Sequence, residues 1–178
     1  MVFPIVVSFY TQDTGYEQEV NNLIASLNKF NLEYDIEAIV NTGNWVKNTK
    51  YKATLISKML KKHKRPVLFL DADAVVRQYP SLFEEITCDM AWWGSNTGTL
   101  YFANTRLAWL TLCLWIRLCE LQNDWDQRIL AEVTRLVKPK VYELPYSYCH
   151  IFDSGVEEPP VIEHFQASRR FKNAVTRT

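Results

Sequence analysis

The feature that most constrains the fold of this chain is a short apolar run that ends in two acidic residues. Val67–Leu70 contains no polar side chain, and Asp71-Ala72-Asp73 follows it directly. A strand that is apolar on both faces has to be covered on both faces, which is typical of a parallel sheet between helices. The acidic pair then lies at the carboxyl end of the strand, the edge where open α/β sheets bind ligands.

The rest of the chain alternates between strand and helix patterns. The patterns predict strands at Pro4–Tyr10, Tyr34–Val40, Met90–Trp93, Thr99–Ala103, Val141–Leu144 and Val161–Phe165. They predict helices at Glu17–Phe30, at Thr49–His63, at Arg106–Leu121, and from an Asp124 N-cap through Val137. We expect the five residues 94–98 to form a polar turn. We expect the helix 106–121 to be buried, because it is apolar on nearly all sides. The pattern therefore predicts one α/β domain over residues 1–178.

The charged residues exclude a nucleic-acid-binding protein and point to an anionic ligand. Lysines plus arginines equal aspartates plus glutamates at 20 each, so no overall cationic field exists. The charges are nevertheless segregated: residues 38–70 carry eight basic groups and no acid, and residues 71–163 carry 14 acids against seven bases. Residues 164–178 carry four more basic groups. Two basic arms around an acidic centre suit an anion bridged to the acids by a metal ion, although a solvated lysine-rich helix face gives the same pattern.

The cysteines and the apolar segments bear on the compartment. None of the four cysteines forms a CxxC pair, and Cys113 and Cys119 lie in an apolar segment where we expect them buried. We therefore expect a reducing compartment without disulfides. The apolar start of the chain lacks the features of a signal peptide, and Leu107–Leu121 is too short and too charged to span a bilayer. These observations predict a cytoplasmic protein with no transmembrane segment.

The acidic pair is suited to holding a metal ion. Residues i and i+2 of an extended chain point the same way, so Asp71 and Asp73 can hold one divalent cation from a single side. Oxygen ligands suit Mg²⁺ or Mn²⁺, and an added imidazole favours Mn²⁺. The alternative is a turn in which the aspartates cap backbone amides.

Three classes of enzyme use a strand-end aspartate of this kind. A P-loop NTPase needs GxxxxGK[ST], which this chain lacks. A haloacid-dehalogenase-like phosphatase stays an alternative, because Asp71–Val75 resembles its DxDx[TV] signature. That signature lies near the start of such proteins and is followed by a later acidic pair, whereas two strand-helix units precede it here and no Asp-Asp pair follows.

The third class fits several segments at once. The chain resembles the GT-A-fold nucleotide-sugar glycosyltransferases, above all the glycogenin and lipopolysaccharide galactosyltransferase group and the related nucleotide-diphospho-sugar transferases. The resemblance spans about residues 4–172 and rests on the order of its landmarks. They are an N-terminal strand, a lysine-bearing helix, the DxD motif, an Asn-x-Gly strand, an Asp-Gln pair and a late histidine. It implies a Rossmann-like, mostly parallel sheet flanked by helices, with residues 1–73 as the nucleotide-binding half and 74–178 as the half for donor sugar and acceptor.

The resemblance also implies roles for individual residues. It assigns the uridine to Ser8, Tyr10 and Thr11, the ribose or diphosphate to Asn48 and Lys52, the metal to Asp71, Asp73 and His164 around Ala72, sugar hydroxyls to Asn96 and Gly98, catalysis beside the transferred sugar to Asp126 and Gln127, and phosphate to Arg169 or Arg170. Four of these assignments have a plainer alternative. Tyr10 could be a core aromatic and Asn96 part of a polar hairpin turn. Asp126 could be an acid that favours a helix start, and His164 a solvent-facing histidine. The group's glycine near the late histidine is missing here, which puts the arginine assignment in doubt.

The function implied is metal-dependent transfer of a sugar from a nucleotide-diphosphate donor, a UDP-sugar with Mn²⁺ or Mg²⁺, to a hydroxyl of a glycan or glycoconjugate. The residues leave retention or inversion of stereochemistry open. A non-catalytic module that binds nucleotide-sugar or glycan is the second alternative. Because the chain is short for this class, acceptor-binding elements are expected to be trimmed or supplied by another domain, such as a further glycosyltransferase domain.

Overall fold

The computed structural model describes residues 3–175, so both ends of the predicted domain lie outside the described residues. A six-stranded central sheet has the order β2-β1-β3-β6-β5-β7. Its strands are β1 (Ile5–Thr11), β2 (Tyr34–Ile39), β3 (Val67–Leu70), β5 (Met90–Trp93), β6 (Asn96–Phe102) and β7 (Val141–Glu143). Only β6 runs antiparallel to its neighbours among these strands, so the sheet is mostly parallel, as predicted.

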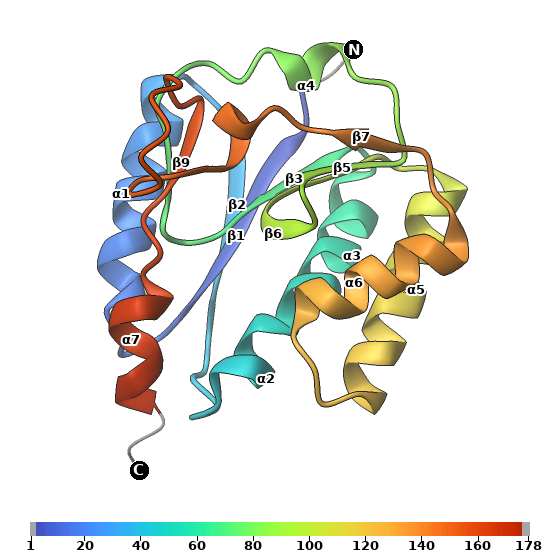
Figure 1. Cartoon of the computed structure of the whole chain (residues 1–178), viewed down its shortest axis with the longest axis horizontal. Helices are drawn as coiled ribbons and strands as arrows, with labels where there is room; N and C mark the ends of the chain where they lie inside the picture. Colours follow the sequence, from blue (N-terminus) through green and yellow to red (C-terminus); the bar gives the residue numbers. More distant parts are fainter. Residues whose placement is uncertain (1–2, 176–178) are drawn as a thin grey trace.

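Helices and a small second sheet cover the two faces of the central sheet (Figure 1). One face carries α3 (Tyr51–His63), α5 (Arg106–Leu121) and α6 (Asp126–Val137). The other face carries α1 (Tyr16–Lys29) and the three-stranded sheet β4-β9-β8. The remaining elements are α2 (Trp45–Thr49), β4 (Ala74–Val76), α4 (Leu82–Glu85), the 3₁₀ helix Tyr146–Cys149, β8 (His150–Ile151), β9 (Ile162–His164) and α7 (Ser168–Val175). The chain therefore forms one three-layered domain.

Strand β3 is buried on both faces, as its sequence predicts. Val67 and Phe69 pack into the core on the α3, α5 and α6 side. Leu68 and Leu70 pack into the core on the α1 side. This alternation with a period of two residues follows from strand geometry, and it means that β3 has no solvent-facing side.

The predicted hairpin turn and the predicted helix starts need correction. Strand β6 already begins at Asn96, and the turn consists of Gly94 and Ser95 alone, whose φ angles of 51° and 67° fit a two-residue primed turn. Helix α6 begins at Asp126 after Trp125, so Asp124 is not its N-cap; the Asp124 carboxylate instead accepts from the Trp125 amide. The predicted helix 49–63 corresponds to α3, which begins at Tyr51, and the pattern did not predict the short helix α2 that precedes it.

Helix α5 is buried on one face only, which corrects a second expectation. Leu112 is 0% exposed, whereas Leu110 and Leu121 are 51% and 63% exposed. Cys113 is exposed, contrary to prediction, while Cys119 is buried. The reason is that only the side of α5 toward α3, α6 and the sheet finds packing partners. All four cysteines are free thiols. Among the described helices, none is long and apolar enough to cross a membrane.

The two faces of α5 predict different costs for the same substitution. Leu112→Ala should lower the free energy of unfolding by about 2–5 kcal/mol, because it leaves a cavity in the core. Leu121→Ala on the exposed face should change it by less than about 0.5 kcal/mol. Urea unfolding of both variants measures the difference. Equal losses would contradict the one-sided burial of α5.

Candidate functional site

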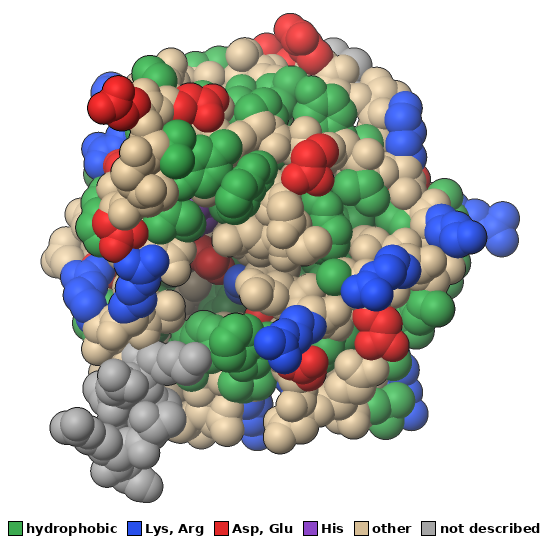
Figure 2. Space-filling view, in the orientation of Figure 1, with side chains coloured by type: hydrophobic (Ala, Val, Ile, Leu, Met, Phe, Trp, Pro, Cys, Tyr) green, Lys and Arg blue, Asp and Glu red, His purple; other side chains and the backbone are tan. Residues whose placement is uncertain are grey.

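The carboxyl end of the sheet opens into a cavity of about 750 Å³. Figure 2 shows the hollow on one face of the molecule, with acidic, basic and histidine side chains on its floor. Most residues that the sequence assigns to a site line this cavity: Tyr10, Thr11, Asn48, Lys52, Asp71, Ala72, Asp73, Asn96, Gly98, Asp126 and Gln127. They come from the ends of three strands and from α2, α3 and α6, so the fold gathers segments that are far apart in the sequence.

Three of the predicted residues form a group that could hold a metal ion. One ligand atom from each of Asp71, Asp73 and His164 lies within 4.8 Å of the others. Asp71 directly follows β3, and His164 reaches Asp73 because β9 pairs with β4 in the register Ala74 opposite His164. Two carboxylates and one imidazole are a donor set that suits Mn²⁺ or Mg²⁺. The residues present therefore fit the metal that the sequence resemblance implies.

His164 is locked in place by its neighbours on β6. Its side chain is 2% exposed, which rules out the alternative of a solvent-facing histidine. Its Nε2 lies 2.8 Å from Thr99 Oγ1, and its Nδ1 lies 3.8 Å from Asp73 Oδ1. A Cβ atom at Gly98 would come within 2.9 Å of the imidazole ring, so only glycine lets the ring approach the strand this closely. Such hydrogen-bonded support is what orients a metal-ligating histidine.

Asp73 and His164 stabilise each other in their charged forms. Burial opposes the charge on Asp73, but hydrogen bonds from His164 and from the Ala167 amide lower the pKa of Asp73 below its usual value. The Ala167 amide donates to Asp73 Oδ2 over 2.6 Å. Burial also opposes a charged His164, but Cys149 and Asp73 outweigh it and raise the pKa of His164 to about 10. A metal ion bound here must displace the imidazole proton, because metal ligation requires neutral histidine.

Lys52 connects the metal-binding group to the start of α6. Its ammonium lies 3.0 Å from Asp71 Oδ1 and 3.4 Å from Asp126 Oδ2. It also donates to the carbonyl and hydroxyl oxygens of Thr97, at 3.3 and 3.2 Å. Burial opposes the charge of Lys52, but Asp126 and Asp71 outweigh it and raise the pKa of Lys52 above its ordinary value. The cavity therefore contains one buried cation that two carboxylates share.

Asp126 is more than a helix-start acid. It is 4% exposed, and its Oδ2 accepts a hydrogen bond from the Thr97 hydroxyl at 3.0 Å. Its backbone carbonyl accepts from the Trp115 indole, which fixes the start of α6 against α5. The charge of Asp126 is thus held by Lys52 and Thr97 inside the fold rather than by a helix dipole at the surface.

Four predicted residues are not among those that line the cavity. His164 is one of them, and it is connected to the cavity through Asp73, which does line it. Ser8 is completely buried, and its hydroxyl has no hydrogen-bond partner among the described residues. Arg169 pairs with Asp153 and Arg170 pairs with Glu19, and neither arginine lines the cavity. Asn48 does line the cavity, but its side chain is occupied by Asn41 and Thr42. The structure therefore brings together the metal, sugar and lysine positions and leaves the proposed phosphate arginines outside.

Sequence reasoning missed several residues that shape the site. Thr97 contacts Lys52, and Thr99 contacts His164. Both threonines belong to the segment Asn96–Leu100, in which only the asparagine and the glycine were predicted to be site residues. The Asn96 side chain accepts from the Gly98 amide at 2.7 Å, so it is partly occupied by its own strand. Trp45 and Phe171 also line the cavity, and no pattern in the sequence distinguishes them from core aromatics.

Comparisons with known proteins identify the fold. Neither a protein-family model nor a curated protein sequence matches the chain. Among solved structures, a glycosyltransferase involved in glycosylation of the major capsid of the virus PBCV-1 matches with a TM-score of 0.75 at 13% identity, over 96% of this chain and 98% of the other. The glycosyltransferase GlyE of Streptococcus pneumoniae TIGR4 matches with a TM-score of 0.63 at 19% identity, over 92% of this chain and 55% of GlyE. The chain therefore has the fold of these glycosyltransferases, and it spans about half of GlyE.

The environment of Asp126 predicts an effect on stability. Asp126→Asn should lower the free energy of unfolding by roughly 1.5–3 kcal/mol, because it weakens charged hydrogen bonds to Lys52 and Thr97 in a buried cluster. Asp124→Asn, two residues earlier and with a 43% exposed side chain, should cost less than about 1 kcal/mol. Chemical unfolding of the two variants provides the measurement. If both cost the same small amount, Asp126 acts only as a helix-start acid.

Proposed function

We propose that the protein is a metal-dependent glycosyltransferase that moves a sugar from a nucleotide-diphosphate donor, a UDP-sugar, to a hydroxyl of a glycan acceptor. The observation that carries this proposal is the convergence of Asp71, Asp73 and His164, of which the two aspartates line the cavity. A fold shared with solved glycosyltransferases supports the same conclusion.

The floor of the cavity suits the diphosphate of the donor. Asp71, Asp73 and His164 would hold Mn²⁺ or Mg²⁺, which when bound stabilises the negative charge that develops on a diphosphate leaving group. Asp71 lines the cavity with a 36% exposed side chain, so it is accessible from the cavity. Asp73 and His164 are buried and oriented by Ala167 and Thr99, which fixes their positions in advance of binding.

Lys52 is the cation best placed to assist the leaving group. It lies 3.0 Å from Asp71 Oδ1 in the cavity wall, and its charge is retained at neutral pH because two carboxylates raise its pKa. A fixed cation that needs no reorientation is worth most in a water-poor site. Arg169 and Arg170 are held by Asp153 and Glu19 outside the cavity, so our proposal gives them no part in phosphate binding.

Asp126 and Gln127 would border the transferred sugar. Both line the cavity beside Asn96 and Gly98, which the sequence assigns to sugar hydroxyls. Because Lys52 and Thr97 already bind Asp126 Oδ2, we assign Asp126 the role of holding Lys52 and orienting the sugar. The metal-binding group and the sugar-binding group are then connected through a single side chain, Lys52.

The proposal predicts that UDP binding depends on a divalent metal and on Asp73. Asp73→Asn keeps the size of the side chain and an acceptor for the Ala167 amide, but it removes the charge. Loss of a residue that only supports a metal ligand costs up to about 100-fold in metal affinity. Because Asp73 is itself a proposed ligand, the affinity for UDP in the presence of Mn²⁺ should fall by more than this. Removing Mn²⁺ from the wild-type protein should have a comparable effect, and titration calorimetry measures both.

Asp153→Asn is the matched control, because Asp153 is an exposed aspartate that pairs with Arg169 outside the cavity. It should bind Mn²⁺ and UDP as the wild type does. Tight, metal-independent UDP binding by wild type and Asp73→Asn alike would refute the metal site. A UDP-sugar that is neither hydrolysed nor transferred, although UDP and Mn²⁺ bind, would favour a binding module.

A further inference from the structure

Two tryptophans from distant segments meet at the edge of the cavity. Trp45 begins α2, and Trp125 directly precedes α6. Their ring centroids lie 6.3 Å apart with the planes at 84°, and both residues line the cavity. Trp125 is 40% exposed, although burial of an indole ring stabilises a folded protein. A partly exposed aromatic pair inside a cavity is poorly explained by core packing.

We propose that Trp45 and Trp125 form the platform on which a pyranose ring of the acceptor glycan stacks. The proposal rests on the glycosyl-transfer function proposed above and adds where the acceptor binds. A pyranose has apolar C–H faces and polar hydroxyls at its edge, so it is complementary to an aromatic surface surrounded by hydrogen-bonding groups. Here the surrounding groups include Gln127 and Asn41, which line the same cavity.

The platform is held in a fixed shape before any ligand binds. The Arg128 guanidinium packs on the Trp125 ring, 5.2 Å from its centroid, and the Trp125 amide donates to Asp124. Trp45 packs edge to face against Trp125, since the two ring planes cross at 84°. Aromatic side chains with few rotatable bonds that are already fixed lose little entropy on binding.

The position of the platform favours the acceptor over the donor. Lys52 lies between Asp71 of the metal-binding group and Asp126, and Trp125 is the residue next to Asp126. Going outward from the metal-binding group, the order is therefore Asp71, Lys52, Asp126 and then Trp125. A donor with its diphosphate at the metal would place its sugar near Asp126, and the group that attacks that sugar would approach from the Trp125 side.

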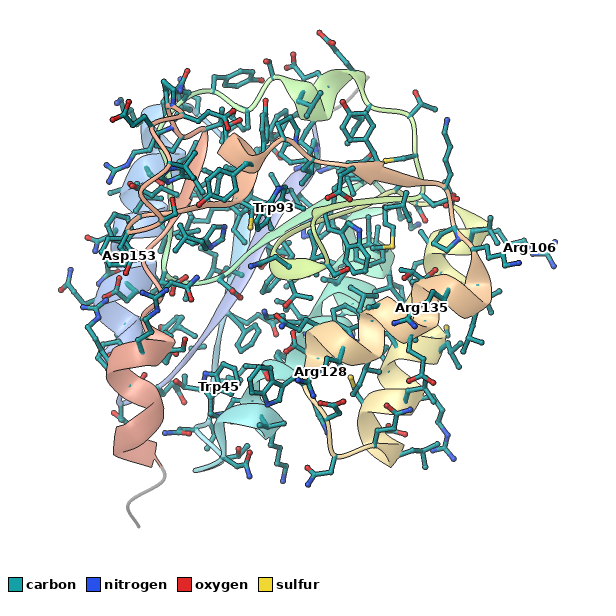
Figure 3. All side chains as sticks on the ribbon, in the orientation of Figure 1. Trp45, Trp93, Arg106, Arg128, Arg135 and Asp153 are labelled. Carbon is teal, nitrogen blue, oxygen red and sulfur yellow. The ribbon has the colours of Figure 1, made fainter. Side chains whose placement is uncertain are left out.

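A third tryptophan, Trp93, which is labelled in Figure 3, provides a matched control. Trp93 lies at the β5–β6 hairpin, away from Trp45 and Arg128 in this view, and it is not among the residues that line the cavity. Its ring packs on Tyr146 with centroids 4.8 Å apart. Trp93→Ala therefore removes the same side chain as the platform variants do, but at a position outside the platform.

The test measures carbohydrate and nucleotide binding separately. Methyl pyranosides of glucose, galactose, mannose and xylose are titrated by saturation-transfer NMR, and UDP with Mn²⁺ is titrated by calorimetry. The wild type should bind at least one methyl pyranoside, and Trp125→Ala should weaken that binding by about tenfold or more, as expected for loss of ring stacking. Trp45→Ala should also weaken it, whereas Trp93→Ala should not. UDP affinity should stay within about twofold in all three variants.

The proposal would be overturned if no methyl pyranoside binds the wild type, or if Trp93→Ala weakens pyranoside binding as much as Trp125→Ala does. It would also be overturned if Trp45→Ala and Trp125→Ala bind pyranosides as the wild type does. Loss of UDP affinity in these two variants would overturn it as well, because the tryptophans would then hold the nucleobase. Trp125→Phe keeps an aromatic face and should retain most of the pyranoside binding, which decides the matter if Trp125→Ala does not fold. Pyranoside binding through Trp125 without any UDP binding would instead contradict the transfer function and leave a carbohydrate platform.

Discussion

The arrangement of the site depends on one buried cation. The Lys52 ammonium is almost completely buried, and a charge can be kept there only when partners replace the water it has lost. Asp71 supplies one partner from the end of β3, Asp126 supplies another from the start of α6, and Thr97 supplies oxygens from β6. Because these elements are far apart in the sequence, the same contacts that neutralise Lys52 also set the position of α6 against the sheet. The contacts of Lys52 therefore both shape the cavity wall and balance the charges in the cavity.

The pairing of charges explains how two neighbouring aspartates are accommodated at the end of β3. Asp71 is paired with Lys52, and Asp73 is paired with His164 and the Ala167 amide. Burial and the charge of Asp73 raise the pKa of Asp71, whereas Lys52 opposes that rise. The side chains of Asp71, Asp73 and His164 are oriented by partners on other elements, so a divalent ion that bound here would displace the His164 proton without rearranging the strands.

Much of this could be predicted from the sequence, because the signals are local. The apolar run Val67–Leu70 depends on nearest neighbours and solvent, and the buried strand that it predicts is confirmed. A strand also forms in the alternating segment 34–40, but Val40 lies beyond its end and is 76% exposed. Errors arose where the tertiary structure decides. The exposed face of α5 carries the three charged residues of the helix, Arg106, Arg117 and Glu120. It also carries leucines, and the placement of α3 and α6 is what covers Leu112 and leaves Leu110 exposed. The positions of Arg169 and Arg170 were missed because their partners, Asp153 and Glu19, are not adjacent in any sequence pattern.

Gly98 has a structural role that the sequence motif did not predict. In the sequence it belongs to a polar cluster that suggests a turn, yet it lies within β6, where glycine normally weakens a strand. The structure gives the compensation: the imidazole of His164 packs where a side chain would begin, and Asn96 Oδ1 accepts from the Gly98 amide on the same short segment. Glycine at this position costs backbone entropy on folding, but it allows β9 to approach β6 closely. The pairing of β9 with β4 brings His164 to Asp73, and the close approach at Gly98 lets the same imidazole reach Thr99 on β6. The Asn-x-Gly segment therefore helps to orient His164 toward Asp73.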